Sequence, residues 1–304
     1  MKHPIDPKID CVFKALLGSE ENRNLLTHFL NAVLAKELKA PVVEVEIQNP
    51  YNDKEFLSDK FSIVDVKARD NEDRLYQIEI QMAQYAHLTA RMLYSWADIY
   101  SQQLQSGDDY HLLKPTYSIW LLNDTLMATD DEYAHSYKLR DQKGQVLLEH
   151  GGIWLFEIEK FHAQTIASEA QRWLRFFKEG EELDDQNLPD WMDTPEMEQA
   201  MSTLQKFSDK ERDYHAYQAR QNYVREQRSI QKELEEAMIE KEQALEREAI
   251  AIQREATAME REATAMEREA QALSEKNQAL VAKEQALAEI ERLKALLAQK
   301  GTMH

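Results

Sequence analysis

Apolar and polar residues follow one another in the first half of the chain in patterns that predict strands packed between helices. Apolar residues recur at helical spacing over residues 9–17 and about 20–36, with Ser19 placed as the N-cap of the second helix. Residues 43–48 alternate with a period of two, which is typical of a half-buried strand. The nearly continuous apolar run 117–122 predicts an inner strand covered on both faces.

A β-hairpin and a helix are predicted between these strands. Two strand-like runs, 61–69 and 74–82, flank a polar cluster at 70–73. An apolar stripe that begins at Leu88 predicts a helix that stops at Gly107. Further strands are predicted at 137–139, 145–148 and 153–158, and further helices at 169–178 and from 196 onward.

The last part of the chain predicts one long helix. Helical spacing is unbroken from about Asp209, and the heptad REATAME occurs at 254–260 and again at 261–267. Beyond residue 225 there is no aromatic, proline or aspartate residue. The sequence therefore divides into a domain at 1–225, helical from about residue 165, and an extended coiled-coil-like helix at 226–304.

The heptads give this helix a narrow apolar seam. Its d positions are Leu245, Ile252, Met259, Met266, Leu273, Leu280 and Leu287, and alanine fills most a positions. A parallel in-register dimer would set Glu255 and Glu262 against Glu260 and Glu267 of the other copy. The pattern favours a weak coiled coil, as a homo-oligomer, or a helix that docks on a basic partner protein. A partly disordered extension is the competing interpretation.

Composition limits the environment and the partners. The single cysteine, Cys11, cannot form an intramolecular disulfide, and no apolar run reaches the length of a membrane span, so we expect a cytoplasmic protein without membrane contact. The net charge is −19, and residues 1–225 hold 39 acidic and 25 basic residues. Such an acidic protein repels the phosphates of nucleic acid, so any DNA chemistry must rest on a local site at which divalent cations offset the repulsion.

The predicted hairpin brings two carboxylates together. If residues 70–74 form its loop, Asp65 lies directly opposite Glu79. One face then carries Ile63, Asp65, Lys67, Gln77, Glu79 and Gln81, and the core face carries Val64, Val66, Ala68, Tyr76, Ile78, Ile80 and Met82. Directly opposed carboxylates have Cβ atoms roughly 4.5–5.5 Å apart, which destabilises a sheet unless positive charge lies between them.

Two sources of that positive charge fit the pattern. Mg²⁺ or Mn²⁺ prefers carboxylate oxygens and water, and such an ion can activate water for attack on a phosphodiester. The alternative is a solvated strand face on which Lys67 and Arg69 screen the two carboxylates without a metal.

The same stretch of sequence resembles a known family. The segment FSIVDVKARDNEDRLYQIEIQ at 61–81, preceded by IDPKIDCVFKALLG at 5–18, resembles the PD-(D/E)XK nuclease-fold proteins of the recombination-promoting nuclease (Rpn) or transposase family. The resemblance continues through the helix with Tyr94 and through 110–122, and more loosely to about residue 225. It implies an α/β, restriction-endonuclease-like mixed sheet flanked by helices, followed here by the long heptad helix. It also implies Mg²⁺-dependent endonuclease activity on DNA, linked to recombination and mobile elements.

Carried over position by position, the resemblance assigns roles to single residues. Asp65 and Glu79 match the motif aspartate and glutamate as metal ligands, and the backbone carbonyl of Ile80 is a further ligand. Gln81 stands where many nucleases of this fold have lysine, and Val64 replaces the motif proline. Gln81 still permits a hydrogen bond to an attacking water but removes a positive charge, and one such contact in the transition state can be worth about 3 kcal/mol.

Three assignments stay open at this point. Asp10 either matches the acidic metal ligand that many such folds carry on their opening helix, or caps the helix that begins beside it. Lys67 either replaces the missing lysine or only screens charge. The chain is either a metal-dependent DNA endonuclease with Asp65, Glu79 and Gln81 as catalytic residues, or a catalytically impaired nuclease-fold interaction protein that assembles through its C-terminal helix.

Overall fold

A mixed sheet forms the centre of the N-terminal domain. The computed structural model describes residues 1–48, 65–82 and 87–301, with side chains as far as residue 294. Within these ranges six strands follow the order β1-β2-β3-β4-β6-β5. Their bounds are β1 (Val45–Gln48), β2 (Val66–Asp70), β3 (Leu75–Gln81), β4 (Thr116–Leu122), β5 (Ala134–Tyr137) and β6 (Gly151–Glu157). Strands β1, β2 and β3 are antiparallel neighbours, β3, β4 and β6 run parallel, and β5 is antiparallel to β6.

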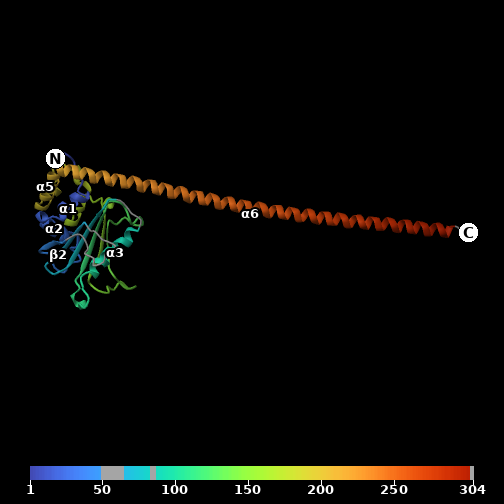
Figure 1. Cartoon of the computed structure of the whole chain (residues 1–304), viewed down its shortest axis with the longest axis horizontal. Coiled ribbons are helices and arrows are strands. Elements are labelled where there is room, and N and C mark those ends of the chain that lie inside the picture. The colour runs from blue at the N-terminus through green and yellow to red at the C-terminus, as the bar shows by residue number, and fades with distance from the viewer. Residues whose placement is uncertain (49–64, 83–86, 302–304) are drawn as a thin grey trace. The chain divides into compact units, whose positions relative to one another are not determined.

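Helices cover both faces of this sheet. The helices of the domain are α1 (Asp10–Leu17), α2 (Arg23–Val33), α3 (Leu88–Ser101), α4 (Glu169–Glu179) and α5 (Pro195–Asp209), and the long helix α6 (Glu211–Gly301) follows them. Apolar side chains of α1, α2, α4 and α5 share one core with one face of the sheet, and α3 packs with Trp120 and Ile153 on the other face. Figure 1 shows α1 and α2 on one side of the strands and α3 on the opposite side. The predicted α/β fold class, a restriction-endonuclease-like mixed sheet flanked by helices, is confirmed.

The hairpin has the predicted register. Val66 pairs with Ile78 and Arg69 with Leu75, so the next pair in the same register joins Asp65 to Glu79. The predicted core face is confirmed for the described residues, since Val66, Ala68, Tyr76, Ile78 and Ile80 are all buried. Residues 61–64, which the sequence placed in the first strand, lie outside the described residues.

The opposite face of the hairpin is also covered, because α3 packs over it. Gln77 is 0% exposed and Glu79 is 4% exposed. The interpretation of a solvated strand face is therefore wrong for β3, and these two polar side chains need partners inside the protein.

Several element boundaries differ from the prediction. The hydroxyl of Ser19 donates to the carbonyl of Ala15 instead of capping, and the short 3₁₀ turn Glu20–Asn22 precedes α2. Helix α3 ends at Ser101, well before Gly107, which lies in a turn with φ of 99°. Residues 145–148 form no strand and contribute only the isolated bridge of Val146 to Arg140.

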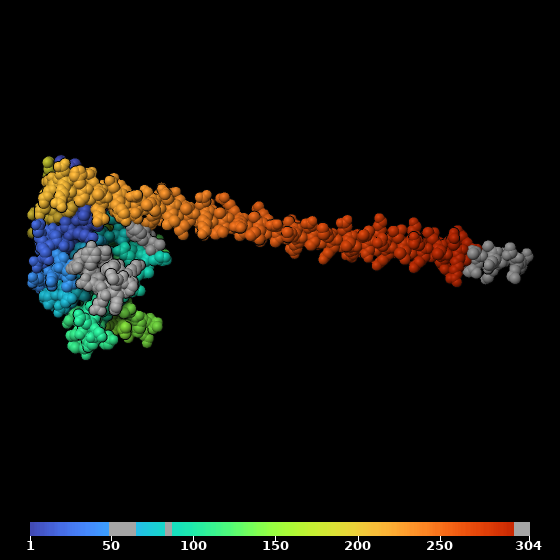
Figure 2. Space-filling view, in the orientation of Figure 1, coloured from blue at the N-terminus to red at the C-terminus, as the bar shows by residue number. Residues whose placement is uncertain are grey.

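The long C-terminal helix is a separate compact unit for most of its length. The chain divides into Met1–Ile230, which includes the first turns of α6, and Gln231–His304. All side chains from 232 to 294 are exposed, as Figure 2 illustrates for the orange and red part of the helix. No helix within the described ranges is both long enough and apolar enough to cross a membrane.

Candidate active site

Asp65 and Glu79 meet where the hairpin ends. The N–H of Asn123, the residue that follows β4, donates to the carbonyl of Gln81, so the backbone polar groups of Gln81 face β4. Because these groups alternate in direction along a strand, those of Ile80 face β2. Glu79 therefore belongs to the pairs that exchange no hydrogen bonds with β2, in which opposed side chains approach most closely. This geometry turns Asp65 and Glu79 into neighbours.

The Asp65 carboxylate is held by one backbone donor and one lysine. Its Oδ2 accepts the N–H of Ile80 at 3.0 Å, and its Oδ1 lies 3.3 Å from Nζ of Lys14 on α1. Burial raises the pKa of Asp65, and the Ile80 N–H and the Lys14 ammonium partly offset that rise. The hydrophobic spacing of α1 gave no indication that Lys14 would reach the hairpin.

The Glu79 carboxylate is the more deeply enclosed of the two. Its Oε1 accepts from Nε2 of Gln77 at 3.3 Å, and its Oε2 lies 3.4 Å from Nη2 of Arg91 on α3. Burial, followed by the negative charge of Asp65, raises the pKa of Glu79 to about 8, although Arg91 and Gln77 act in the opposite direction. In the absence of a bound cation, the two carboxylates therefore resist being ionised together.

A row of buried polar side chains orients Gln77. Its amide nitrogen also donates to the hydroxyl of Ser95 on α3 at 2.7 Å, and its carbonyl accepts from Ser118 at 3.4 Å. The indole of Trp120 donates to the hydroxyl of Ser118 at 2.8 Å. Because Gln77 is completely buried, this chain of bonds fixes which end of its amide faces Glu79.

The remaining predicted site residues lie around this pair. The amide oxygen of Gln81 accepts from Nη1 of Arg91 at 3.3 Å. The carbonyl of Ile80 points toward β2, as its N–H does, and so faces the edge on which Asp65 lies. Helix α1 begins at Asp10, whose carboxylate accepts the N–H of Cys11 and lies 3.6 Å from Nε of Arg220. The charge of Asp10 also contributes to the raised pKa of Asp65, which places it within electrostatic range of the pair.

The donor set suits a hard divalent cation that keeps several waters. Among the described residues, no group of three or more His, Cys, Asp or Glu side chains is arranged to hold a metal ion. Two carboxylates and one backbone carbonyl supply only oxygen atoms, which is the ligand chemistry that Mg²⁺ prefers alongside bound water. Neighbouring carboxyl groups with raised pKa values, one buried and one half-buried, are also the kind of pair that a divalent cation would allow to ionise. The residues present therefore fit such an ion.

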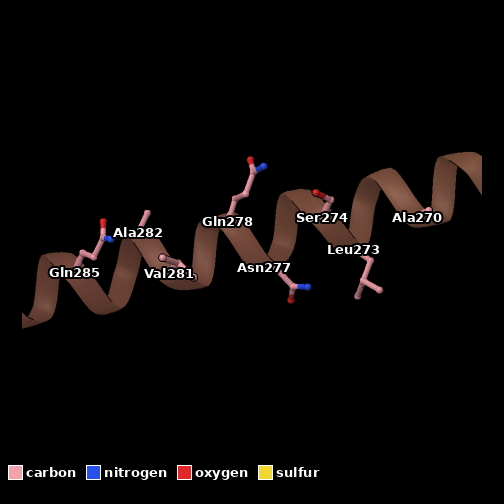
Figure 3. A pocket seen from close by; sticks show the side chains of 8 residues that line it. All are labelled: Ala270, Leu273, Ser274, Asn277, Gln278, Val281, Ala282 and Gln285. Carbon is pink, nitrogen blue, oxygen red and sulfur yellow. The ribbon is translucent and has the colours of Figure 1, made fainter.

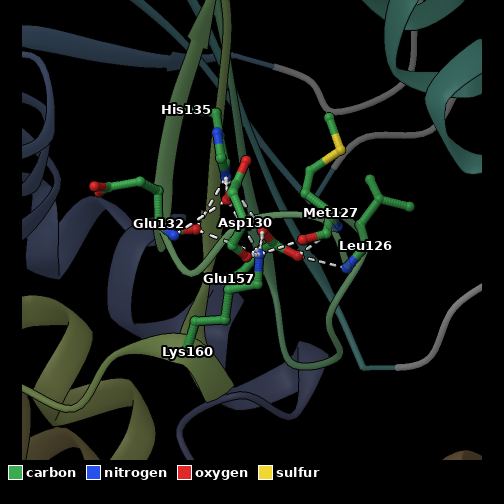
Figure 4. A network of polar contacts seen from close by, with 7 residues as sticks. All are labelled: Leu126, Met127, Asp130, Glu132, His135, Glu157 and Lys160. Carbon is green, nitrogen blue, oxygen red and sulfur yellow. Dashed lines mark hydrogen bonds and ion pairs between the residues drawn. The ribbon is translucent and has the colours of Figure 1, made fainter.

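A second buried carboxylate anchors the loop at the same end of the sheet. Glu157 ends β6, and its side chain is 0% exposed. It accepts the N–H groups of Leu126 and Met127 and lies 2.9 Å from Nζ of Lys160, which also donates to the carbonyl of Asp130 (Figure 4). Leu126 and Met127 in turn pack against the apolar cluster of α3. The network therefore ties the loop after β4 to the helix that carries Arg91.

Helix α6 has a shallow groove along its own surface. Figure 3 shows its lining, in which small side chains alternate with larger ones: Ala270, Leu273, Ser274, Asn277, Gln278, Val281, Ala282 and Gln285. A groove on one exposed helix encloses no ligand. It is instead the kind of surface that a second helix would cover.

One comparison with known proteins gives a match. A family model described as PD-(D/E)XK nuclease family transposase matches residues 7–233. No match is found among curated proteins or among solved structures. The matched range contains Asp65, Glu79 and Arg91 and ends in the first turns of α6.

Proposed function

Because the chain belongs to the PD-(D/E)XK nuclease family transposases, we propose that it is a divalent-metal-dependent DNA endonuclease built around Asp65 and Glu79. The observation that carries this proposal is the pair of carboxylates, buried Glu79 and half-buried Asp65, in register across the hairpin and both with raised pKa values. A protein gains no stability from two such groups side by side. Perturbed acids of this kind gather at functional sites.

In this proposal Asp65, Glu79 and the carbonyl of Ile80 would hold Mg²⁺ or Mn²⁺, with Asp10 as a further acidic group near the ion. The ion would lower the pKa of a bound water and offset the negative charge of the phosphate. In the hydrolysis that such an ion would support, a water oxygen would form a bond to phosphorus, the bond from phosphorus to one ester oxygen would break, and the leaving oxygen would take up the proton that the water loses. Gln81 orients the water by a hydrogen bond, and the products are one phosphate end and one hydroxyl end.

Replacing Asp65 tests the proposal directly. Asp65→Asn keeps the size of the side chain but removes the ligand charge, so plasmid cleavage in Mg²⁺ or Mn²⁺ is expected to fall at least about 100-fold. Gel electrophoresis of supercoiled plasmid measures the rate, with a chelator as the metal-free reference. Asp73→Asn, an exposed carboxylate on the same hairpin, is the matched control and should cut like the wild type. Equal cleavage by Asp65→Asn and the wild type would contradict the proposal.

A second candidate is a nuclease-fold interaction protein without catalysis. It is favoured by the neutral Gln81 at the position of the motif lysine and by the exposed heptad seam of α6. Calorimetric titration with Mg²⁺ and Mn²⁺ separates the two candidates. An inert relative should show no metal binding that depends on Asp65 and Glu79, whereas the endonuclease should lose that binding in either single variant.

We also propose that α6 brings copies of the chain, or the chain and a partner protein, together. Its d residues are 48–62% exposed, a fraction that a packed seam would not leave. The double variant Met259→Glu/Met266→Glu is expected to shift the full chain to a smaller species in sedimentation velocity. Thr257→Glu/Thr264→Glu adds the same charge away from the seam and should sediment like the wild type. Identical profiles for both double variants would contradict a role for the seam.

A further inference from the structure

Arg91 is a half-exposed cation placed beside the residue that departs from the nuclease motif. It lies on the second turn of α3, and its guanidinium contacts Oε1 of Gln81 through Nη1 at 3.3 Å and Oε2 of Glu79 through Nη2 at 3.4 Å. The same group lies over the ring of Trp120, 5.5 Å from the ring centroid. Three separate contacts therefore hold the guanidinium at this edge of the site.

The contacts with Glu79 do not explain the whole placement. Neutralising Glu79 would not by itself require a second hydrogen bond from Arg91 to the neutral amide of Gln81. The side chain of Arg91 is 48% exposed and that of Glu79 is 5% exposed, so the guanidinium reaches from the buried carboxylate to the surface where a substrate would lie. A guanidinium has five N–H donors, and these two bonds engage two of them.

We propose that Arg91 does the work of the missing motif lysine, by placing its positive charge on the phosphate oxygens as negative charge develops there. This inference rests on the proposed endonuclease function. Arginine stays charged at every relevant pH and matches the geometry of a phosphate with paired donors, so it suits this role without any titration. The positive charge of Arg91 comes from helix α3, which packs on the sheet, whereas the motif lysine would lie on strand β3 at the position of Gln81.

The test uses four variants of the full chain: Arg91→Ala, Arg91→Lys, Gln81→Lys, and the double variant Gln81→Lys/Arg91→Ala. Arg91→Ala is expected to lower kcat by about 100- to 1,000-fold with little change in KM, because the charge acts in the transition state. Arg91→Lys should retain a larger share of kcat. Adding Gln81→Lys to Arg91→Ala returns a cation to the motif position and should recover at least about tenfold of the lost kcat. Arg23→Ala is the control, since Arg23 is 45% exposed and ion-paired on α2.

Metal titration supplies a readout that does not depend on cleavage. Removing a cation 3.4 Å from Glu79 should leave Mg²⁺ binding by Arg91→Ala as tight as in the wild type, or tighter. Loss of metal binding in Arg91→Ala would assign Arg91 to holding the carboxylates in place and overturn the proposal. Cleavage by Arg91→Ala within about threefold of the wild type would overturn this inference alone. A wild-type chain that does not cut would remove both this inference and the proposed function.

Discussion

Replacing Glu79 with glutamine is expected to make the metal-free protein more stable near pH 9 while abolishing the proposed activity. The side chain is 5% exposed, and its pKa is raised to about 8, so ionising it in the folded protein is costly. Glutamine keeps the volume and an acceptor for Gln77 but carries no charge. We expect the free energy of unfolding at high pH to rise by about 2 kcal/mol and cleavage to fall about 1,000-fold.

The sign of this pH dependence of the free energy of unfolding follows from whether the folded or the unfolded protein holds the proton of Glu79. Between the ordinary value of 4.5 and the folded value of about 8, the folded protein holds a proton on Glu79 that the unfolded chain releases. The free energy of unfolding of the wild type therefore falls as the pH rises through this window and stays low above it. The raised pKa of Asp65 acts in the same direction.

Chemical unfolding of both proteins in the presence of a chelator, at several pH values from about 5 to 9, measures this difference. The curves should coincide near pH 5 and diverge above it, with the glutamine variant more stable. Glu72→Gln, an exposed hairpin carboxylate, should track the wild type. Added Mg²⁺ should stabilise the wild type only, and more strongly as the pH rises, because the bound ion requires an ionised Glu79. A variant that is less stable than the wild type near pH 9 would contradict the arrangement.

The hairpin shows how much of this site the sequence could predict. Alternation of apolar residues along the two strands, together with a polar loop at 70–74, was enough to set the register and to place Asp65 opposite Glu79. A one-residue slip would have turned Tyr76 and Ile78 away from the core that they share with Val66 and Ala68, so the apolar residues exclude that pairing. Local pattern therefore determined the position of the two carboxylates.

The surroundings of the carboxylates depended on contacts between distant parts of the chain. Lys14 and Arg91 reach the site from α1 and α3, and no spacing rule links either of them to the hairpin. For the alternative without a metal, the sequence analysis gave the screening charges to Lys67 and Arg69, because they lie on the hairpin itself. The burial of Gln77 and Glu79 was missed for the same reason, since a strand pattern does not show which helix will cover it.

Replacing Glu157 with glutamine is expected to destabilise the domain by about 3 kcal/mol at neutral pH, which is among the larger effects of a single substitution. The carboxylate is 0% exposed, accepts two backbone N–H groups and pairs with Lys160, whose side chain is 11% exposed. Glutamine would remove the nearer of two anions from the ammonium of Lys160, which keeps the Asp130 carboxylate at 3.6 Å, and would present an NH₂ group to donors. The exposed neighbouring substitution Glu159→Gln is the control and should leave the free energy of unfolding unchanged.

The pH dependence of that loss identifies its cause. Burial alone would raise the pKa of Glu157, but the bond from Lys160 and the N–H groups of Met127 and Leu126 outweigh it and lower the pKa. A lowered pKa means that the ionised form stabilises the folded state above the ordinary value of 4.5 and that this contribution is lost as the pH falls through the folded value. The difference between the wild type and Glu157→Gln should therefore shrink as the pH falls below about 4.5. A difference in the free energy of unfolding that persists unchanged into acid would assign the lost stability to the shape of the side chain and not to its charge.

Because this network anchors the loop that packs against α3, Glu157→Gln should also slow cleavage without weakening metal binding at Asp65 and Glu79.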